Sequence, residues 1–146
     1  MDNAIKSLKA LKEALASSDK LKKIMNNGKE ISKGITTRPR LNLTALNKET
    51  GMNSYIALSY NKLEAYETHL AYYLKVNVVT DAVNQEDPAT LVFEIVKELN
   101  DIISQEELIF GFGEQFVFGE MEESYFDNNQ LTWGYVIIYG ISDEPI

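Results

Sequence analysis

The clearest pattern of apolar and polar positions runs from residue 70 to residue 104. Over residues 70–79, apolar side chains that include Leu74, Val76 and Val78 alternate with others such as Lys75 and Asn77. A period of two predicts a β-strand with different residues on its two faces. A polar linker follows, and after it a helix.

The helix start is marked by Asp87 and Pro88. Asp is a favoured N-cap, and Pro fits the first helical position because the amide that it lacks would have no partner there. The apolar residues that follow fall within an arc of roughly 140° at helical spacing. They are Leu91, Val92, Ile95, Val96, Leu99, Ile102 and Ile103. Because a one-sided helix directly after a strand has to bury its apolar side on a sheet, we expect the helix over 87–104 to pack on this strand.

The first 28 residues predict two more helices. Residues 4–16 carry an apolar stripe, and Lys6, Lys9 and Glu13 lie opposite it. The stripe consists of Ile5, Leu8, Leu11 and Leu15, and we interpret it as core packing rather than as a partner-binding surface. Ser18 is typical of a new N-cap, and Asn26, Asn27 and Gly28 form the stop of the short helix that follows.

Residues 29–53 hold no sustained period, and we interpret them as an irregular or extended loop. Arg38-Pro39-Arg40 favours extended backbone, and Gly51 favours a turn or mobile loop over 47–53. A long irregular segment is uncommon inside a small domain. Three alternatives stay open: a functional segment, one that a partner orders, or an ordinary edge strand with a long hairpin.

The other alternating runs predict strands over 55–60, 108–112, 116–126 and 131–141. Asp127, Asn128 and Asn129 favour a tight hairpin between the last two. The order of elements predicts an α+β fold with a mainly antiparallel or mixed sheet of about four to five strands. We expect an N-terminal helix and the central amphipathic helix to cover one face. Residues 1–146 then form a single domain, made of a helical part over 1–28, the loop over 29–53, and the sheet with its helix over 54–146.

The amino-acid composition excludes several classes of protein. The chain of 146 residues is 45% hydrophobic and has no cysteine, which excludes a disulfide scaffold and thiol chemistry. No apolar run approaches the roughly 18 residues of a membrane span, and the N-terminus has no apolar signal core. We therefore expect a soluble intracellular protein without a membrane partner.

The sequence lacks the residues that most catalytic mechanisms need. His69 is the one histidine, so Ser–His catalysis and histidine ligation of a metal would both depend on it. Gly111 and Gly113 are followed by neither a lysine nor a helix, which excludes the phosphate-loop motifs. An acidic tract at Glu114, Glu120, Glu122, Glu123 and Asp127 lacks the spacing of a calcium loop. We expect no catalytic, cofactor or metal residues, and no enzyme.

The charge is divided unevenly along the chain. The net charge is −8, yet residues 1–40 hold ten Lys and Arg against four Asp and Glu, and residues 41–146 hold four Lys against eighteen acids. A basic patch on one copy and an acidic patch on the next would favour a head-to-tail contact that closes into a ring. The candidate interface residues are Lys6, Lys9, Lys12, Arg38, Arg40, Glu120, Glu122 and Glu123. Two alternatives remain, a nucleic-acid surface without a recognition motif and a lysine-rich helix that is only solvated.

The order of elements resembles that of the tail terminator or tail-completion proteins of long-tailed bacteriophages, a class of minor tail protein. The resemblance covers most of the chain as a pattern of elements, without a diagnostic motif. It is carried by residues 72–79 (YYLKVNVV), 87–96 (DPATLVFEIV) and 132–139 (TWGYVIIY). The lysine-rich first helix departs from the pattern.

The resemblance implies a hexameric ring of this chain, assembled in the host cytoplasm and placed in the virion tail. Such a ring caps the tail tube protein and offers the head-tail joining surface to a head completion or connector protein. DNA would pass an acidic lumen without specific binding, because like charges repel. Our leading hypothesis is therefore a structural phage assembly protein. The alternative is a small intracellular binding module whose basic N-terminal helix meets an acidic protein or nucleic acid.

Overall fold

The computed structural model describes residues 2–65, 69–82, 85–106, 116–126 and 130–145, and side chains over 5–59, 74–82 and 85–103. The elements in this part of the chain follow in order. They are α1 (Asp2–Ser17), α2 (Asp19–Asn26), the short 3₁₀ helix η1 (Ser32–Gly34), β1 (Ile35–Thr36), α3 (Leu43–Thr50), β2 (Ser54–Ala65), β3 (His69–Asp81), α4 (Pro88–Glu106), β4 (Phe116–Phe126) and β5 (Gln130–Pro145).

The strands form one mixed sheet. Their order across the sheet is β1-β2-β3-β5-β4. β1 runs parallel to β2 and pairs only with Ile56 and Ala57, whereas the other neighbours are antiparallel. The α+β class and the mixed sheet are confirmed. The predicted strand over 108–112 and the hairpin turn at Asp127, Asn128 and Asn129 lie outside the described residues.

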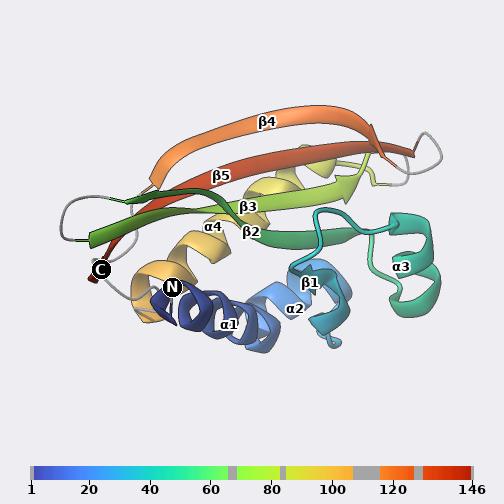
Figure 1. Ribbon diagram of the computed structural model, residues 1–146. Coiled ribbons are helices and arrows are strands. Elements are labelled where there is room, and N and C mark those ends of the chain that lie inside the picture. Colours follow the sequence, from blue (N-terminus) through green and yellow to red (C-terminus); the bar gives the residue numbers. More distant parts are fainter. Residues whose placement is uncertain (1, 66–68, 83–84, 107–115, 127–129, 146) are drawn as a thin grey trace.

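Three helices cover one face of this sheet (Figure 1). α1 contacts β1 and β2, α4 contacts β3 and β5, and α2 contacts both of these helices. Helices α1 and α4 therefore lie under opposite halves of the sheet. The expected cover by an N-terminal helix and a central amphipathic helix is confirmed.

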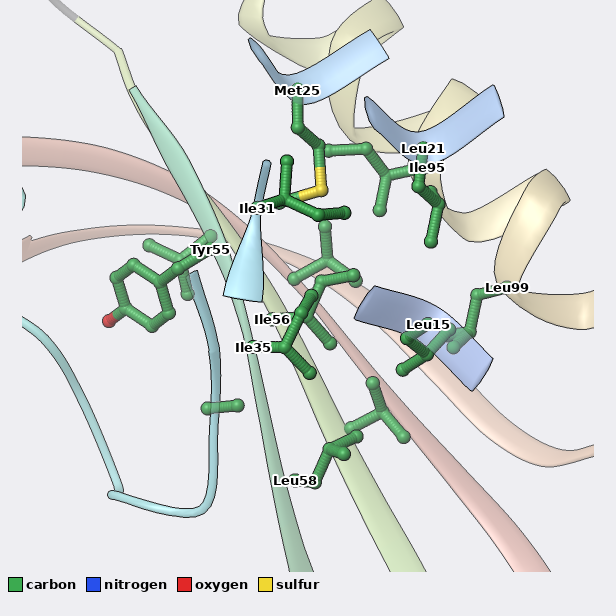
Figure 2. Packing of buried hydrophobic residues seen from close by; sticks show 14 of the residues in the cluster. Leu15, Leu21, Met25, Ile31, Ile35, Tyr55, Ile56, Leu58, Ile95 and Leu99 are labelled. Carbon is green, nitrogen blue, oxygen red and sulfur yellow. The ribbon is translucent and has the colours of Figure 1, made fainter. Parts of the chain in front are cut away.

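The core lies between these helices and the sheet. Ile56 and Leu58 of β2 pair with Val78 and Val76 of β3, and all four side chains are buried. The intervening Lys75 and Asn77 are only partly buried, as the alternation predicts. Figure 2 shows the residues that the helices contribute to this core. Buried examples are Leu15, Leu21, Met25, Ile95 and Leu99.

Strand β2 is buried on both faces near its start. Tyr55 and Ala57 are buried although they alternate with Ile56 and Leu58. Figure 2 shows the Tyr55 ring directed away from Ile56 and Leu58. The sheet therefore also buries side chains on its second face at this end.

Helix boundaries follow the predicted caps. Ser18 Oγ accepts a hydrogen bond from the Leu21 amide at 3.2 Å and begins α2. The helix ends at Asn26, and Asn27 follows as the C-cap in the left-handed conformation. Asp87 Oδ1 accepts one from the Thr90 amide at 3.2 Å and begins α4. These caps satisfy amides that the first turn of a helix leaves free.

The prediction for α1 is wrong at one position. Ile5 is 52% exposed, and Ser7 is buried in its place. At 100° per residue, Ser7 lies about 40° from Leu11 on the helix circumference, whereas Ile5 lies about 120° away. The direction midway between the fully buried Leu11 and Leu15 lies about 60° from Ser7 and about 100° from Ile5, so Ser7 is closer to the buried side.

The irregular loop predicted over 29–53 contains regular structure. η1, β1 and α3 all fall within it. Asn42 Oδ1 accepts a hydrogen bond from the Ala45 amide at 2.9 Å and begins α3, and Gly51 ends it with φ 83°. Leu43 and Leu46 are buried. An eight-residue helix carries too few apolar residues to show a period, so the sequence pattern missed it.

Candidate functional site

The lysines of α1 lie on its exposed side. Lys6, Lys9 and Lys12 are all exposed, and Lys9 and Lys12 are neighbours on the helix surface because they are three residues apart. The exposed Ile5 lies four residues before Lys9 and so belongs to the same side. We call this group, Ile5, Lys6, Lys9 and Lys12, the α1 face.

The predicted arginines lie elsewhere. Arg38 and Arg40 are exposed in the turn between β1 and α3. Figure 1 shows the N-terminus at one end of the helical layer and α3 beyond the other end. The Arg38 amide donates a hydrogen bond to Thr36 Oγ1 at 3.0 Å, which holds the turn. The structure therefore does not bring the predicted lysines and arginines together into one patch.

The predicted acidic residues belong to an outer strand of the sheet. Glu120, Glu122 and Glu123 lie in β4, opposite Val136, Gly134 and Trp133 of β5. Their side chains are outside the described part of the chain. The sheet order places β4 at the edge far from β1, so the acidic tract and the half of the sheet above α1 are separated.

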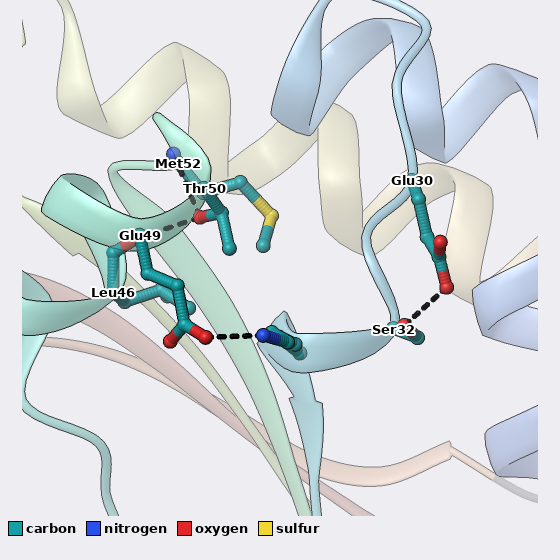
Figure 3. A network of polar contacts seen from close by, with 7 residues as sticks. Glu30, Ser32, Leu46, Glu49, Thr50 and Met52 are labelled. Atoms are coloured by element: carbon teal, nitrogen blue, oxygen red, sulfur yellow. Dashed lines mark hydrogen bonds and ion pairs between the residues drawn. The ribbon is translucent and has the colours of Figure 1, made fainter.

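An open hollow of about 370 Å³ lies beside α3. Its lining is Lys33, Ile35, Thr36, Arg38, Leu41, Asn42, Ala45, Leu46 and Glu49. Lys33 forms an ion pair with Glu49 across it (Figure 3). A second hollow of about 290 Å³ lies next to it and also includes Lys33. Both are open surface depressions lined by polar and apolar atoms, and a large ligand would be only partly enclosed there.

The polar contacts around these hollows are structural. The Thr50 hydroxyl donates to the Leu46 carbonyl at 2.6 Å, and its oxygen accepts a bond from the Met52 amide at 3.1 Å (Figure 3). Glu30 accepts a bond from the Ser32 hydroxyl at 2.5 Å. Asn26 Nδ2 donates to the Glu30 carbonyl at 2.8 Å. Each of these bonds is local in sequence, at the end of α2, before η1 or at the end of α3. The ion pair between Lys33 and Glu49 joins η1 to α3.

In the described part of the chain, Asp87 has a shifted pKa. Hydrogen bonds from the Thr90 hydroxyl and the Thr90 amide lower the pKa of its carboxyl group below the ordinary value of 3.8. The hydroxyl bond is 2.7 Å long. Both bonds belong to the N-cap of α4, so the shift reports helix capping rather than catalysis.

The described side chains form no metal site. Among the residues whose side chains the structure describes, no group of three His, Asp or Glu side chains is placed to hold a metal. His69 is the first residue of β3, and its side chain is not described. Gly111, Gly113, Glu114 and Asp127 also lie outside the description. No helix of the described chain has the length and apolar character needed to cross a membrane.

Sequence reasoning missed a second exposed apolar side chain. Phe93 in α4 is 50% exposed. At helical spacing it lies about 160° from Ile95, which is fully buried. The position of Phe93 outside the apolar stripe of the helix could have indicated this exposure from the sequence. We call the exposed group Phe93, Glu94 and Lys97, with the partly exposed Asp101, the α4 face.

Comparison with solved structures finds a likeness in fold. No protein-family model and no curated protein matches the sequence. The fold is similar to that of a chain in the virion of a native gene transfer agent (GTA) particle, with a TM-score of 0.62. The match covers 97% of each chain at 11% sequence identity. An identity this low shows a shared fold, and the function of this chain has to be argued separately.

Proposed function

We propose that this protein is a structural component of a phage-like virion and acts there as a ring-forming tail terminator. The observation that carries the proposal is the likeness in fold to a virion chain over 97% of both lengths. A match from end to end means that the two chains share one whole arrangement of helices and strands, rather than a common motif. The order of elements in the sequence independently resembles that of tail terminators.

The surface of the chain supports self-association. α1 and α4 lie under opposite halves of the sheet, and each carries one large apolar side chain that is about half exposed. A contact between two different surfaces of identical copies is heterologous, and it closes into a ring when the rotation between copies permits. In this proposal six copies form the ring, and its flat ends meet the tail tube protein and a head completion or connector protein. DNA passes through the ring, and assembly takes place in the cytoplasm of the bacterial host.

A second candidate is a small binding module. The exposure of Lys6, Lys9 and Lys12 favours it, because three cations on one side of a helix attract an acidic protein or nucleic acid. The acidic remainder of the chain opposes binding to a phosphate backbone. The two candidates differ in what they predict for the purified protein alone.

Mass in solution is the first test. Light scattering behind a sizing column, over a series of protein and salt concentrations, should show a species heavier than the monomer, and negative-stain images of it should show closed rings. Tubes assembled from the tail-tube protein of the same virion should stop growing when this protein is added. A protein that stays monomeric, leaves tube growth unchanged and retards DNA at low salt would contradict the terminator role and support the binding module.

A further inference from the structure

Two large apolar side chains stand out on the described surface. Among the residues whose side chains the structure describes, Ile5 and Phe93 are the large hydrophobic residues that are exposed, at 52% and 50%. Single exposed apolar residues are common on protein surfaces. These two differ from that background because each lies beside charged residues of a defined helix surface.

The two side chains lie away from the buried side of their own helices. Ile95, on the opposite side of α4 from Phe93, lies beside Leu21 of α2 (Figure 2), so Phe93 faces away from α2. Ile5 likewise lies about 120° from the buried Leu11 on α1. α1 contacts β1 and β2, α4 contacts β3 and β5, and the two helices also contact each other.

The charges beside the two apolar residues are of opposite sign. Lys6 and Lys9 lie one and four positions after Ile5, and both are exposed. On α4, Glu94 directly follows Phe93, and the exposed Glu86 and Asp87 lie just before the helix. The exceptions are Asp2 and Glu13 in the sequence of α1 and Lys97 on the α4 face. Each region still has an excess of one sign, basic beside Ile5 and acidic beside Phe93.

We propose that the α1 face of one copy docks on the α4 face of the next, with Ile5 packed against Phe93 and the charges around them paired. The inference rests on the proposed ring and names its subunit contact. A central apolar pair surrounded by charged side chains is the usual anatomy of a protein interface. The charges set register and reject wrong pairings, and the apolar pair is shielded from water.

Cysteine cross-linking tests the contact directly, because the chain has no cysteine of its own. The single variants Ile5→Cys and Phe93→Cys are mixed in equal amounts and treated with a short bis-maleimide. Random collision gives mixed and like pairs in the proportion of about 2 to 1 to 1, whereas docking should enrich the mixed pair at least about fivefold. A mixture of Ala45→Cys on α3 with Phe93→Cys is the matched control, since Ala45 is also exposed and lies outside both faces. A random proportion of Ile5–Phe93 pairs would overturn the proposed contact.

Charge exchange provides a second measurement. Lys6→Glu/Lys9→Glu and Glu86→Lys/Glu94→Lys should each weaken self-association at least about tenfold, because like charges then oppose each other across the contact. Mixing the two variants should restore assembly, since each contact in the mixture again joins opposite charges. Lys29→Glu/Lys48→Glu changes the net charge equally at exposed sites outside the faces and should assemble like the wild type. Circular dichroism and the melting temperature show whether each variant is folded.

The outcomes separate this inference from the proposed function. Wild-type rings with random cross-linking, or folded reversal variants that still form rings, would reject the contact and leave the terminator role standing. Enriched cross-links in a protein that forms no rings and caps no tubes would keep the contact and reject that role. Enrichment that falls from low to high salt identifies the charged part of the contact, because at 0.15 M salt exposed charges are screened over about 8 Å.

Discussion

Removing part of Ile95 tests whether α4 is seated on the sheet by its apolar stripe. Ile95 is fully buried, and Phe93 two residues away is half exposed. Ile95→Ala removes three carbons, worth about 2.4 kcal/mol at about 0.8 kcal/mol each. The cavity left behind adds to this loss, so we expect Ile95→Ala to lower the free energy of unfolding by about 3 kcal/mol.

The matched control is Phe93→Ala on the same helix. It removes more atoms, but half of the side chain is already in water, so we expect a loss of about 1 kcal/mol. Urea denaturation followed by circular dichroism gives both values, and an unchanged dependence on urea shows that the variants unfold in the same way. If Ile95→Ala costs less than about 1 kcal/mol, or no more than Phe93→Ala, the assignment of this stripe to the core is wrong.

Three further predictions concern helix ends and buried charge. Asn42→Ala removes the side chain that accepts the Ala45 amide and should lower the stability by about 1 kcal/mol in urea denaturation, whereas Asn42→Ser should preserve most of it. Gly51→Ala should cost about 1 kcal/mol in the same measurement, because φ is 83° there and residues with a Cβ are strained in that region; an unchanged stability would argue against this end of α3. Ile95→Asp should cost several kcal/mol by placing a charge without a partner in the core, and a loss below about 1 kcal/mol would refute the burial of that position.

A further prediction concerns pH. Because the pKa of Asp87 is lowered in the folded protein, its ionised form stabilises α4 above the ordinary pKa of 3.8, and this contribution is lost as the pH falls below that value toward the folded pKa. The difference in melting temperature between the wild type and Asp87→Asn should be constant near neutral pH and shrink in acid, and a difference that does not change with pH would contradict the role of the charge.

Local signals in the sequence were sufficient for much of the fold. Asp87 with Pro88 marked the start of α4, and Ser18 marked that of α2. The alternation of Leu74, Val76 and Val78 identified the buried face of β3. These features depend on neighbouring residues and on the repeat of a helix or strand, so the sequence alone contains them.

Short elements and the second face of the sheet required the tertiary structure. α3 spans eight residues and is held by buried contacts of Leu43 and Leu46, which a local pattern does not reveal. The burial of Tyr55 on the second face of β2 and the strand order β1-β2-β3-β5-β4 both depend on segments that are distant in the sequence. Pairing between distant segments decides both, and sequence spacing does not encode it.

The candidate interface divides in the same way. The sequence by itself determined that the first 40 residues are basic and the remainder acidic, and that lysines follow one side of the first helix. Only the tertiary structure decided that Lys6 and Lys9 lie beside an exposed Ile5, that Arg38 and Arg40 lie elsewhere, and that Phe93 faces outward on α4. The physical reason is that a helical repeat fixes which residues share a side, whereas the packing of α1 and α4 against the sheet decides which side meets water.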